Sequence, residues 1–128
     1  MSAVTAGSAG LIFLRRGREE LHSWERQTLE RLRRRLALAG ALDVLGAAAL
    51  EAVDEQRPGE LARRLFREPD RFRGRDADGA LELLREEMRR DYAMGRTLFV
   101  GGWELAQTEA RLFAVLHAMD QPSTGSRL

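Results

Sequence analysis

Residues 97–105 read TLFVGGWEL and form the one clear β-like pattern in the 128-residue sequence. Two short apolar runs flank Gly101-Gly102, and a glycine pair supplies the positive φ angles that a two-residue hairpin turn requires. Elsewhere Leu, Ala, Arg and Glu dominate, which favours helices, and Ile occurs once. The sequence therefore predicts an all-α fold, a compact bundle of four to five helices with one small β-hairpin before the last helix.

Apolar side chains that recur every three or four residues predict the helices. The segments with this spacing are 18–39, 41–56, 58 to about 68, 76 or 78 to 94, and the stretch from 108 onward. The 41–56 segment has small residues opposite its apolar stripe, so we expect it to be the central helix. Residues 71–79 contain two glycines and are expected to form a loop.

Single residues mark the ends of the later helices. Asp76 or Asp78 is expected to cap the fourth helix, and Gly95 is expected to end it in a left-handed conformation. Thr108 is expected to cap the last helix. The residues of the fourth helix expected to face the core are Leu81, Leu84, Met88 and Tyr92.

The chain ends and apolar runs bear on domain organisation and compartment. Residues 1–17 and 121–128 are expected to be flexible, which leaves 18–120 as a single helical domain. The apolar run at 11–14 precedes its arginines, the wrong order for a secretory signal. The run at 36–50 contains Asp43 and is shorter than the ~20 apolar residues that cross a bilayer. We therefore expect a cytoplasmic protein with no membrane span, and export together with a partner is the alternative.

The charge pattern leaves three interpretations of one segment open. The net charge is only +1, and all 21 basic residues are arginine. Residues 57–75 hold seven of these arginines against three acidic residues. Because the guanidinium fork suits carboxylates and phosphates alike, this segment predicts an acidic protein partner, a nucleic-acid contact or simply a solvated surface.

Residues with catalytic potential are sparse. The absence of cysteine excludes disulfides, thiol catalysis and thiolate-bound metal. Glu19 and His22 have the i, i+3 spacing of a di-iron ligand pair, but such a site needs a second pair, which the sequence lacks. They are weak candidates for a metal-dependent enzyme, so we expect no cofactor and no catalytic site.

Residues 91–96 (DYAMGR) and 100–112 (VGGWELAQTEARL) carry two resemblances. An acidic residue, Gly-Arg, a Gly-Trp turn and Thr-Glu-Ala-Arg-Leu resemble the tail motif of small bacterial helical accessory proteins, which often carry twin-arginine export signals. This resemblance implies a small protein that works through a larger partner. The same segment is similar to the start of a response-regulator winged-helix domain, but only nine residues follow Met119, too few for a recognition helix.

Together these observations favour a non-enzymatic accessory or adaptor subunit that binds a larger protein. A multi-subunit bacterial complex is one setting for such a role, and the sequence makes no prediction of the protein's own oligomeric state. Tryptophan and arginine often dominate the binding energy of protein interfaces. The residues predicted to contact the partner are Trp103, Phe99, Arg64, Arg67 and Arg71. A nucleic-acid-binding protein that uses residues 57–75 is the alternative, and a carboxylate/histidine metal enzyme is the third hypothesis.

Overall fold

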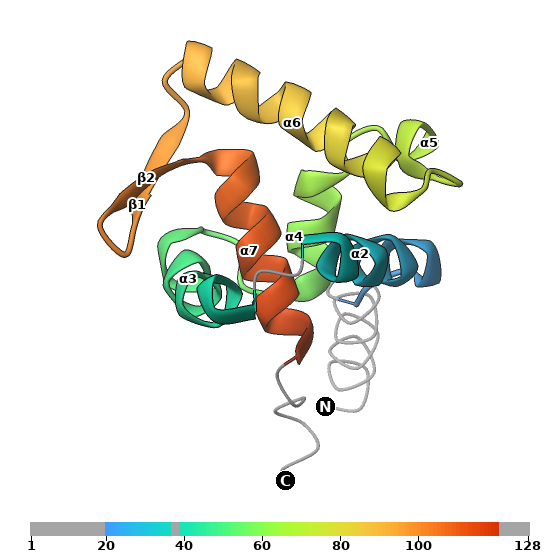
Figure 1. The fold of residues 1–128 in the computed structure, drawn as a ribbon, viewed down its shortest axis with the longest axis horizontal. Coiled ribbons are helices and arrows are strands. Elements are labelled where there is room, and N and C mark those ends of the chain that lie inside the picture. Colours follow the sequence, from blue (N-terminus) through green and yellow to red (C-terminus); the bar gives the residue numbers. More distant parts are fainter. Residues whose placement is uncertain (1–19, 37–38, 121–128) are drawn as a thin grey trace, which may run out of the picture.

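The computed structural model describes residues 20–36 and 39–120, and this part of the chain is mostly helical (Figure 1). One antiparallel hairpin directly precedes the last helix, as the sequence predicts. The elements are α2 (Ser23–Leu36), α3 (Ala39–Ala52), α4 (Pro58–Leu65), α5 (Pro69–Phe72), α6 (Ala77–Ala93), β1 (Thr97–Val100), β2 (Trp103–Ala106) and α7 (Gln107–Asp120). The predicted end segments 1–17 and 121–128 lie outside the described residues.

The first two helices are shorter than the periodicity predicts, because side chains cap them early. The backbone N–H of His22 donates to the carboxylate of Glu25 at 2.7 Å, and α2 begins at the next residue. At the end of α3, the side-chain amide of Gln56 donates to the carbonyl oxygens of Leu50 and Val53. This satisfies carbonyls that the helix leaves without partners, and α3 ends at Ala52.

The short helix α5 lies where the sequence predicted the end of one helix and the start of a loop. Pro69 occupies its first turn, where the missing N–H costs nothing. Phe72 is buried, and its ring centroid lies 4.9 Å from that of Phe66. The loop prediction was therefore wrong for residues 71 and 72, because burial of Phe72 stabilises one helical turn. With α5 included, the described residues form six helices rather than four or five.

The structure shows which of the two candidate aspartates, Asp76 or Asp78, caps α6. Asp76 accepts a hydrogen bond from the backbone N–H of Gly79 at 2.8 Å, and Gly95 follows the helix with φ = 72°. Leu81 and Leu84 are buried, as predicted. The prediction for Tyr92 was wrong: its side chain is 50% exposed, because it leaves the core and its hydroxyl donates toward the hairpin and α7.

The hairpin is closed at both ends. Gly101 and Gly102 have φ angles of 56° and 87°, the double positive φ of the predicted two-residue turn. At the base, the N–H of Gln107 donates to the carbonyl oxygen of Arg96 at 3.0 Å. The register pairs Thr97 with Ala106, Leu98 with Leu105, Phe99 with Glu104 and Val100 with Trp103.

The helix with the most extensive packing is α7, and not the 41–56 segment that the small residues suggested. Helix α7 contacts α3, α4, α6 and both strands, and residues 112–116 along it are all buried. Helix α3 packs closely beside α7 because Gly46 leaves room for it. A Cβ added at Gly46 would lie 2.8 Å from the Cβ of His117. Among the residues that the structure describes, no helix is long and apolar enough to cross a membrane.

Candidate protein-binding surface

The two aromatic residues predicted to contact a partner project from the hairpin into solvent. Phe99 is 76% exposed and Trp103 is 68% exposed. They lie on opposite faces of the two-stranded sheet, because Phe99 is paired with Glu104 and Trp103 with Val100. A partner must therefore contact the outer end of the hairpin on both sides to bury both rings.

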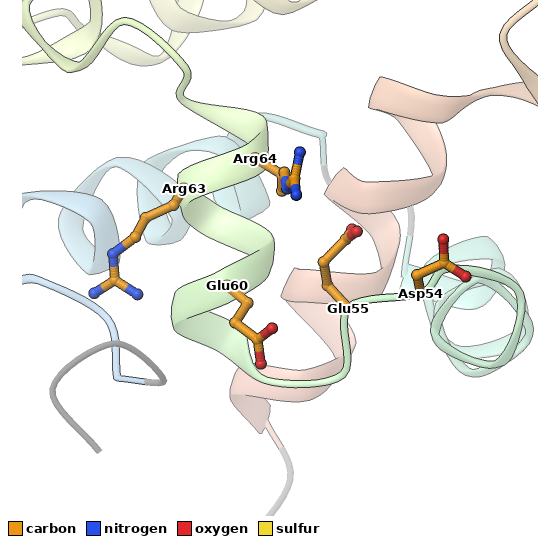
Figure 2. A pocket seen from close by; sticks show the side chains of 5 residues that line it. All are labelled: Asp54, Glu55, Glu60, Arg63 and Arg64. Atoms are coloured by element: carbon orange, nitrogen blue, oxygen red, sulfur yellow. The ribbon is translucent and has the colours of Figure 1, made fainter. Parts of the chain in front are cut away.

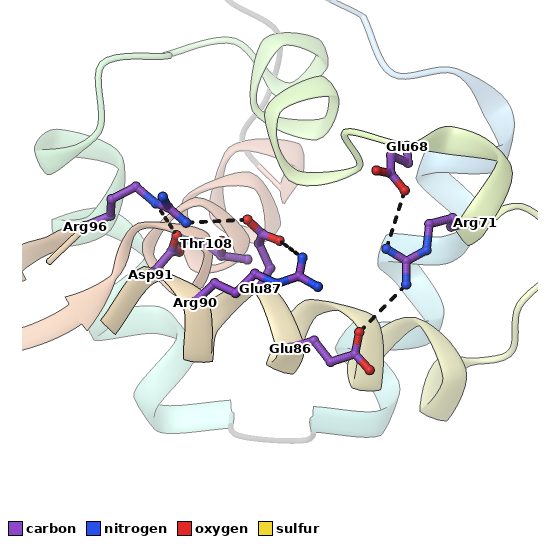
Figure 3. Close-up of polar contacts among 8 residues, drawn as sticks. All are labelled: Glu68, Arg71, Glu86, Glu87, Arg90, Asp91, Arg96 and Thr108. Atoms are coloured by element: carbon purple, nitrogen blue, oxygen red, sulfur yellow. Dashed lines mark hydrogen bonds and ion pairs between the residues drawn. The ribbon is translucent and has the colours of Figure 1, made fainter. Parts of the chain in front are cut away.

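The structure separates one of the three predicted arginines, Arg71, from these aromatic residues. Arg64 is on α4, Arg67 follows α4, and both are exposed. Arg71 belongs to α5 and pairs with Glu68 at 3.4 Å and Glu86 at 3.7 Å (Figure 3). Helix α5 and the hairpin lie at opposite ends of α6 (Figure 1). The structure thus does not bring Arg71 together with Trp103 and Phe99.

Other exposed apolar side chains surround the hairpin. The large hydrophobic residues that are exposed in the described ranges are Val44, Tyr92, Met94, Phe99 and Trp103. All but Val44 lie within residues 92–103, the hairpin and the end of α6 that leads into it. Sequence reasoning missed Val44 and Met94.

The base of the hairpin is fixed by the buried carboxylate of Asp91, which is 3% exposed (Figure 3). Its Oδ2 accepts from the backbone N–H of Thr108 at 2.8 Å, and its Oδ1 accepts from Nε of Arg96 at 2.9 Å. Arg96 precedes β1, and Thr108 lies in the first turn of α7. One carboxylate therefore joins α6, the hairpin and α7.

This contact also corrects the predicted cap. Helix α7 begins at Gln107, so Thr108 lies inside the helix, and the N–H of Thr108 receives its partner from Asp91 on α6. Burial of the carboxyl raises the pKa of Asp91, but hydrogen bonds from Thr108 and Arg96 and the charge of Arg96 lower it more. The net pKa of Asp91 therefore lies below its ordinary value, and the ionised form holds the network together.

A small pocket of about 10 Å³ lies beside Asp91, with room for about one water molecule. Its lining residues are Arg64, Arg67, Glu87, Asp91, Arg96, Gln107, Thr108 and Arg111. The guanidinium of Arg111 also pairs with Glu55 at 2.9 Å. The pocket therefore gathers arginines from three parts of the chain around the base of the hairpin.

A larger open groove of about 430 Å³ lies next to this pocket and shares Arg64 with it (Figure 2). The groove is lined by Asp54, Glu55, Glu60, Arg63 and Arg64. Arg63 and Arg64 leave α4 in different directions, and Glu55 extends toward the side that carries Arg64. This lining offers carboxylates and guanidinium groups, which can form ion pairs with charged groups of either sign.

The weak metal candidates do not form a ligand cluster in the described part of the chain. Glu19 lies outside it, and the exposed His22 has its Nε2 3.3 Å from a guanidinium nitrogen of Arg63. Within residues 20–36 and 39–120, no three histidine or acidic side chains gather in a way that could hold a metal ion.

Comparison of the chain with protein-family models, with curated proteins and with solved structures found no match.

Proposed function

We propose that this chain is a non-enzymatic accessory subunit that binds a larger protein through the outer end of its hairpin, which a compact helical bundle holds in place. The observation that carries the proposal is the exposure of Phe99 and Trp103 on a hairpin whose base is fixed by the buried carboxylate of Asp91. The resemblance of residues 91–112 to the tail motif of accessory proteins agrees with this role.

Energetics support a role for these two rings in binding. Burial of a Phe or Trp side chain removes roughly 150–250 Å² of surface from water. Truncation of such an anchor in an interface typically weakens binding by about 2 kcal/mol or more. The hairpin also lowers the entropic cost of binding, because Leu98, Val100 and Leu105 pack into the core and limit its motion before a partner arrives.

Side-chain contacts within residues 57–75 favour a protein partner over nucleic acid. Arg71 already pairs with Glu68 and Glu86, and Arg73 lies over the ring of Trp24 at 5.3 Å. Both arginines are thus already engaged by side chains of this protein, which makes them less available to phosphates. We therefore do not propose a nucleic-acid-binding role.

The experiment that tests the proposal compares capture of a partner by the wild-type chain and by a double variant, F99A/W103A. The tagged chains are isolated from the cells that make the protein, and bound proteins are quantified by mass spectrometry. We expect the double variant to lose at least about 30-fold in affinity for the captured partner, equivalent to about 2 kcal/mol. Its melting temperature should stay close to that of the wild type, because neither side chain is in the core.

The conservative variant W103F is the matched control and should keep most of the binding, since it retains an aromatic ring. Isolation of the wild-type chain as a lone monomer would contradict the proposal. So would a captured partner whose affinity is the same for the wild type and for F99A/W103A.

A further inference from the structure

We infer that four arginines at the base of the hairpin, Arg64, Arg67, Arg96 and Arg111, bind a carboxylate side chain in an acidic segment of the partner protein. We call this set the arginine cluster. The inference rests on the proposed function and names the chemistry of the partner. All four residues line the same small pocket, although they come from α4, the segment that follows α4, the start of the hairpin and α7.

The charges around this pocket are unbalanced. Four guanidinium groups share the lining with only two carboxylates, those of Glu87 and Asp91. Arg96 contacts both of these carboxylates, at 2.9 Å from Asp91 and 3.8 Å from Glu87. Arg111 takes its partner, Glu55, from outside the pocket. Arg96 therefore already engages both acids of the lining, and Arg111 is engaged by an acid outside it.

Arg64 and Arg67 hold the surplus charge. Both are exposed, and within residues 20–36 and 39–120 neither side chain forms an ion pair or a hydrogen bond. Arg64 lies in the last turn of α4 and Arg67 just beyond the helix, and both line the same pocket. A guanidinium fork can bind a carboxylate through two parallel N–H donors. The pocket itself has room for about one water molecule, so the two exposed forks at its rim form the site for an anion from outside the chain.

The surroundings favour a single carboxylate over an extended polyanion. The groove that adjoins the pocket through Arg64 is lined by Asp54, Glu55 and Glu60. A nucleic-acid backbone that continued from Arg64 in that direction would meet these three acids. An aspartate or glutamate side chain projecting from a protein reaches the arginine cluster without crossing them.

The position of the cluster connects it to the aromatic surface. Arg96 immediately precedes β1, and Phe99 lies near the far end of that four-residue strand. A strand of this length spans about 13 Å at roughly 3.3 Å per residue. In a partner that covers the hairpin, acidic residues about four extended residues away from the segment that contacts Phe99 would therefore reach the arginine cluster.

The test uses the full ¹⁵N-labelled chain and a synthetic seven-residue glutamate-rich peptide, with the same peptide carrying glutamine in place of glutamate as the uncharged control. Binding is followed by NMR, through the arginine Nε–Hε signals. The key variant is R64Q/R67Q, which removes the two surplus charges. The matched control is R31Q/R34Q on α2, which removes two exposed arginines of the same spacing that likewise make no ion pair with the described residues.

We expect the glutamate peptide to shift the Nε–Hε signals of the arginine cluster and the glutamine peptide to leave them unchanged. The dissociation constant should rise at least tenfold in R64Q/R67Q and stay within twofold in R31Q/R34Q. Equal weakening by both double variants would overturn the inference, since it would mean that overall charge alone attracts the peptide. Tighter binding of inorganic phosphate or duplex DNA than of the peptide, lost in R64Q/R67Q, would overturn it in favour of a phosphate site.

The same variants separate this inference from the proposed function. If partner capture depends on Phe99 and Trp103 but R64Q/R67Q captures the partner as well as the wild type does, the inference fails and the proposed function stands. If F99A/W103A captures the partner normally, the proposed function fails, whatever the peptide does.

Discussion

Aromatic side chains pack against one another near one end of α6 and face solvent near the other. At the end near α5, the Phe66 ring packs at a tilt against Trp24 and Phe72, with ring centroids 5.5 Å and 4.9 Å apart, and these contacts join α2, the end of α4 and α5. At the hairpin end, Phe99 and Trp103 face solvent. The same residue types thus stabilise the fold at one end and remain available for binding at the other.

The two ends of α6 are stabilised by different kinds of contact. The α5 end relies on ring packing. The hairpin end relies on one apolar sheet face, with Leu98, Val100 and Leu105, and on the buried carboxylate of Asp91. Because polar contacts and aliphatic side chains already fix the hairpin, its aromatic rings are not needed for folding. The predictions below test this division of roles.

The largest effect we expect is the contrast between F66A and F99A. Phe66 is 1% exposed, so its truncation leaves a cavity in the core and should cost about 3–5 kcal/mol in the free energy of unfolding. Truncation of Phe99 should lower the free energy of unfolding by less than about 0.5 kcal/mol, since this side chain already faces water. Chemical denaturation of both variants measures this, and comparable losses would contradict the contrast.

The next effect concerns the polar anchor of the hairpin. D91A removes the acceptor for Thr108 N–H and the partner of Arg96, and we expect it to cost about 2–4 kcal/mol. The control is D54A, which removes an exposed carboxylate and should cost less than about 0.5 kcal/mol. Amide hydrogen exchange should show faster exchange at the hairpin and at the first turn of α7 in D91A. Unchanged protection there would mean that the aliphatic face alone holds the hairpin.

A smaller effect should follow from G46A, which tests the support beneath the hairpin turn. The nearest side chains to Gly101 belong to α3, and Gly46 sets the spacing of α3 from α7. The added methyl group would meet the Cβ of His117 and the backbone oxygen of Phe113, so we expect a loss of about 1–3 kcal/mol. A47L, at the exposed neighbouring position, is the control and should melt near the wild-type temperature.

Removal of the cation over Trp24 should have a still smaller effect at the α5 end. Arg73 lies 5.3 Å from the centre of the Trp24 ring, and such a contact at an exposed position contributes about 0.5–1 kcal/mol. R73Q should lower stability by that amount and change the fluorescence of Trp24, measured in a W103F background. R75Q should leave the Trp24 emission unchanged, and an equal change in both would exclude a specific contact.

The smallest effect we expect is a change in how stability depends on pH. Because the folded-state pKa of Asp91 lies below its ordinary value of 3.8, the stability that its ionised form contributes is fully present above about that pH. This contribution is lost as the pH falls through the lowered folded-state pKa. D91N should therefore lose less stability than the wild type when both are titrated from pH 6 to acid. Parallel curves for the two proteins would contradict this assignment.

Local sequence signals predicted the parts of the fold that depend on local physics. The glycine pair predicted the hairpin, because two successive residues of other types rarely both adopt a positive φ. Pro58 and Gly95 predicted one helix start and one helix stop. In each case the φ angles open to glycine or to proline decide the local backbone, so no knowledge of distant contacts is needed.

The remaining features depend on residues far apart in the sequence. The burial of Phe72, which makes α5 a helix, depends on Phe66 and the helix that carries it. The exposure of Tyr92 depends on acceptors at Glu104 and Glu109. Trp103 and Phe99 were predicted as candidate contacts from residue type, but their placement on opposite faces and their separation from Arg71 follow from strand register and helix packing.

Asp91 also has a consequence for the order in which the chain folds. Helix α7 receives a partner for its first turn from a residue 17 positions earlier, across the whole hairpin. A helix whose cap lies outside its own sequence gains nothing from that cap while the chain is extended. We therefore expect the start of α7 to become stable only once α6 has formed and the hairpin has closed. A peptide of residues 107–120 alone should accordingly be less helical than its composition suggests.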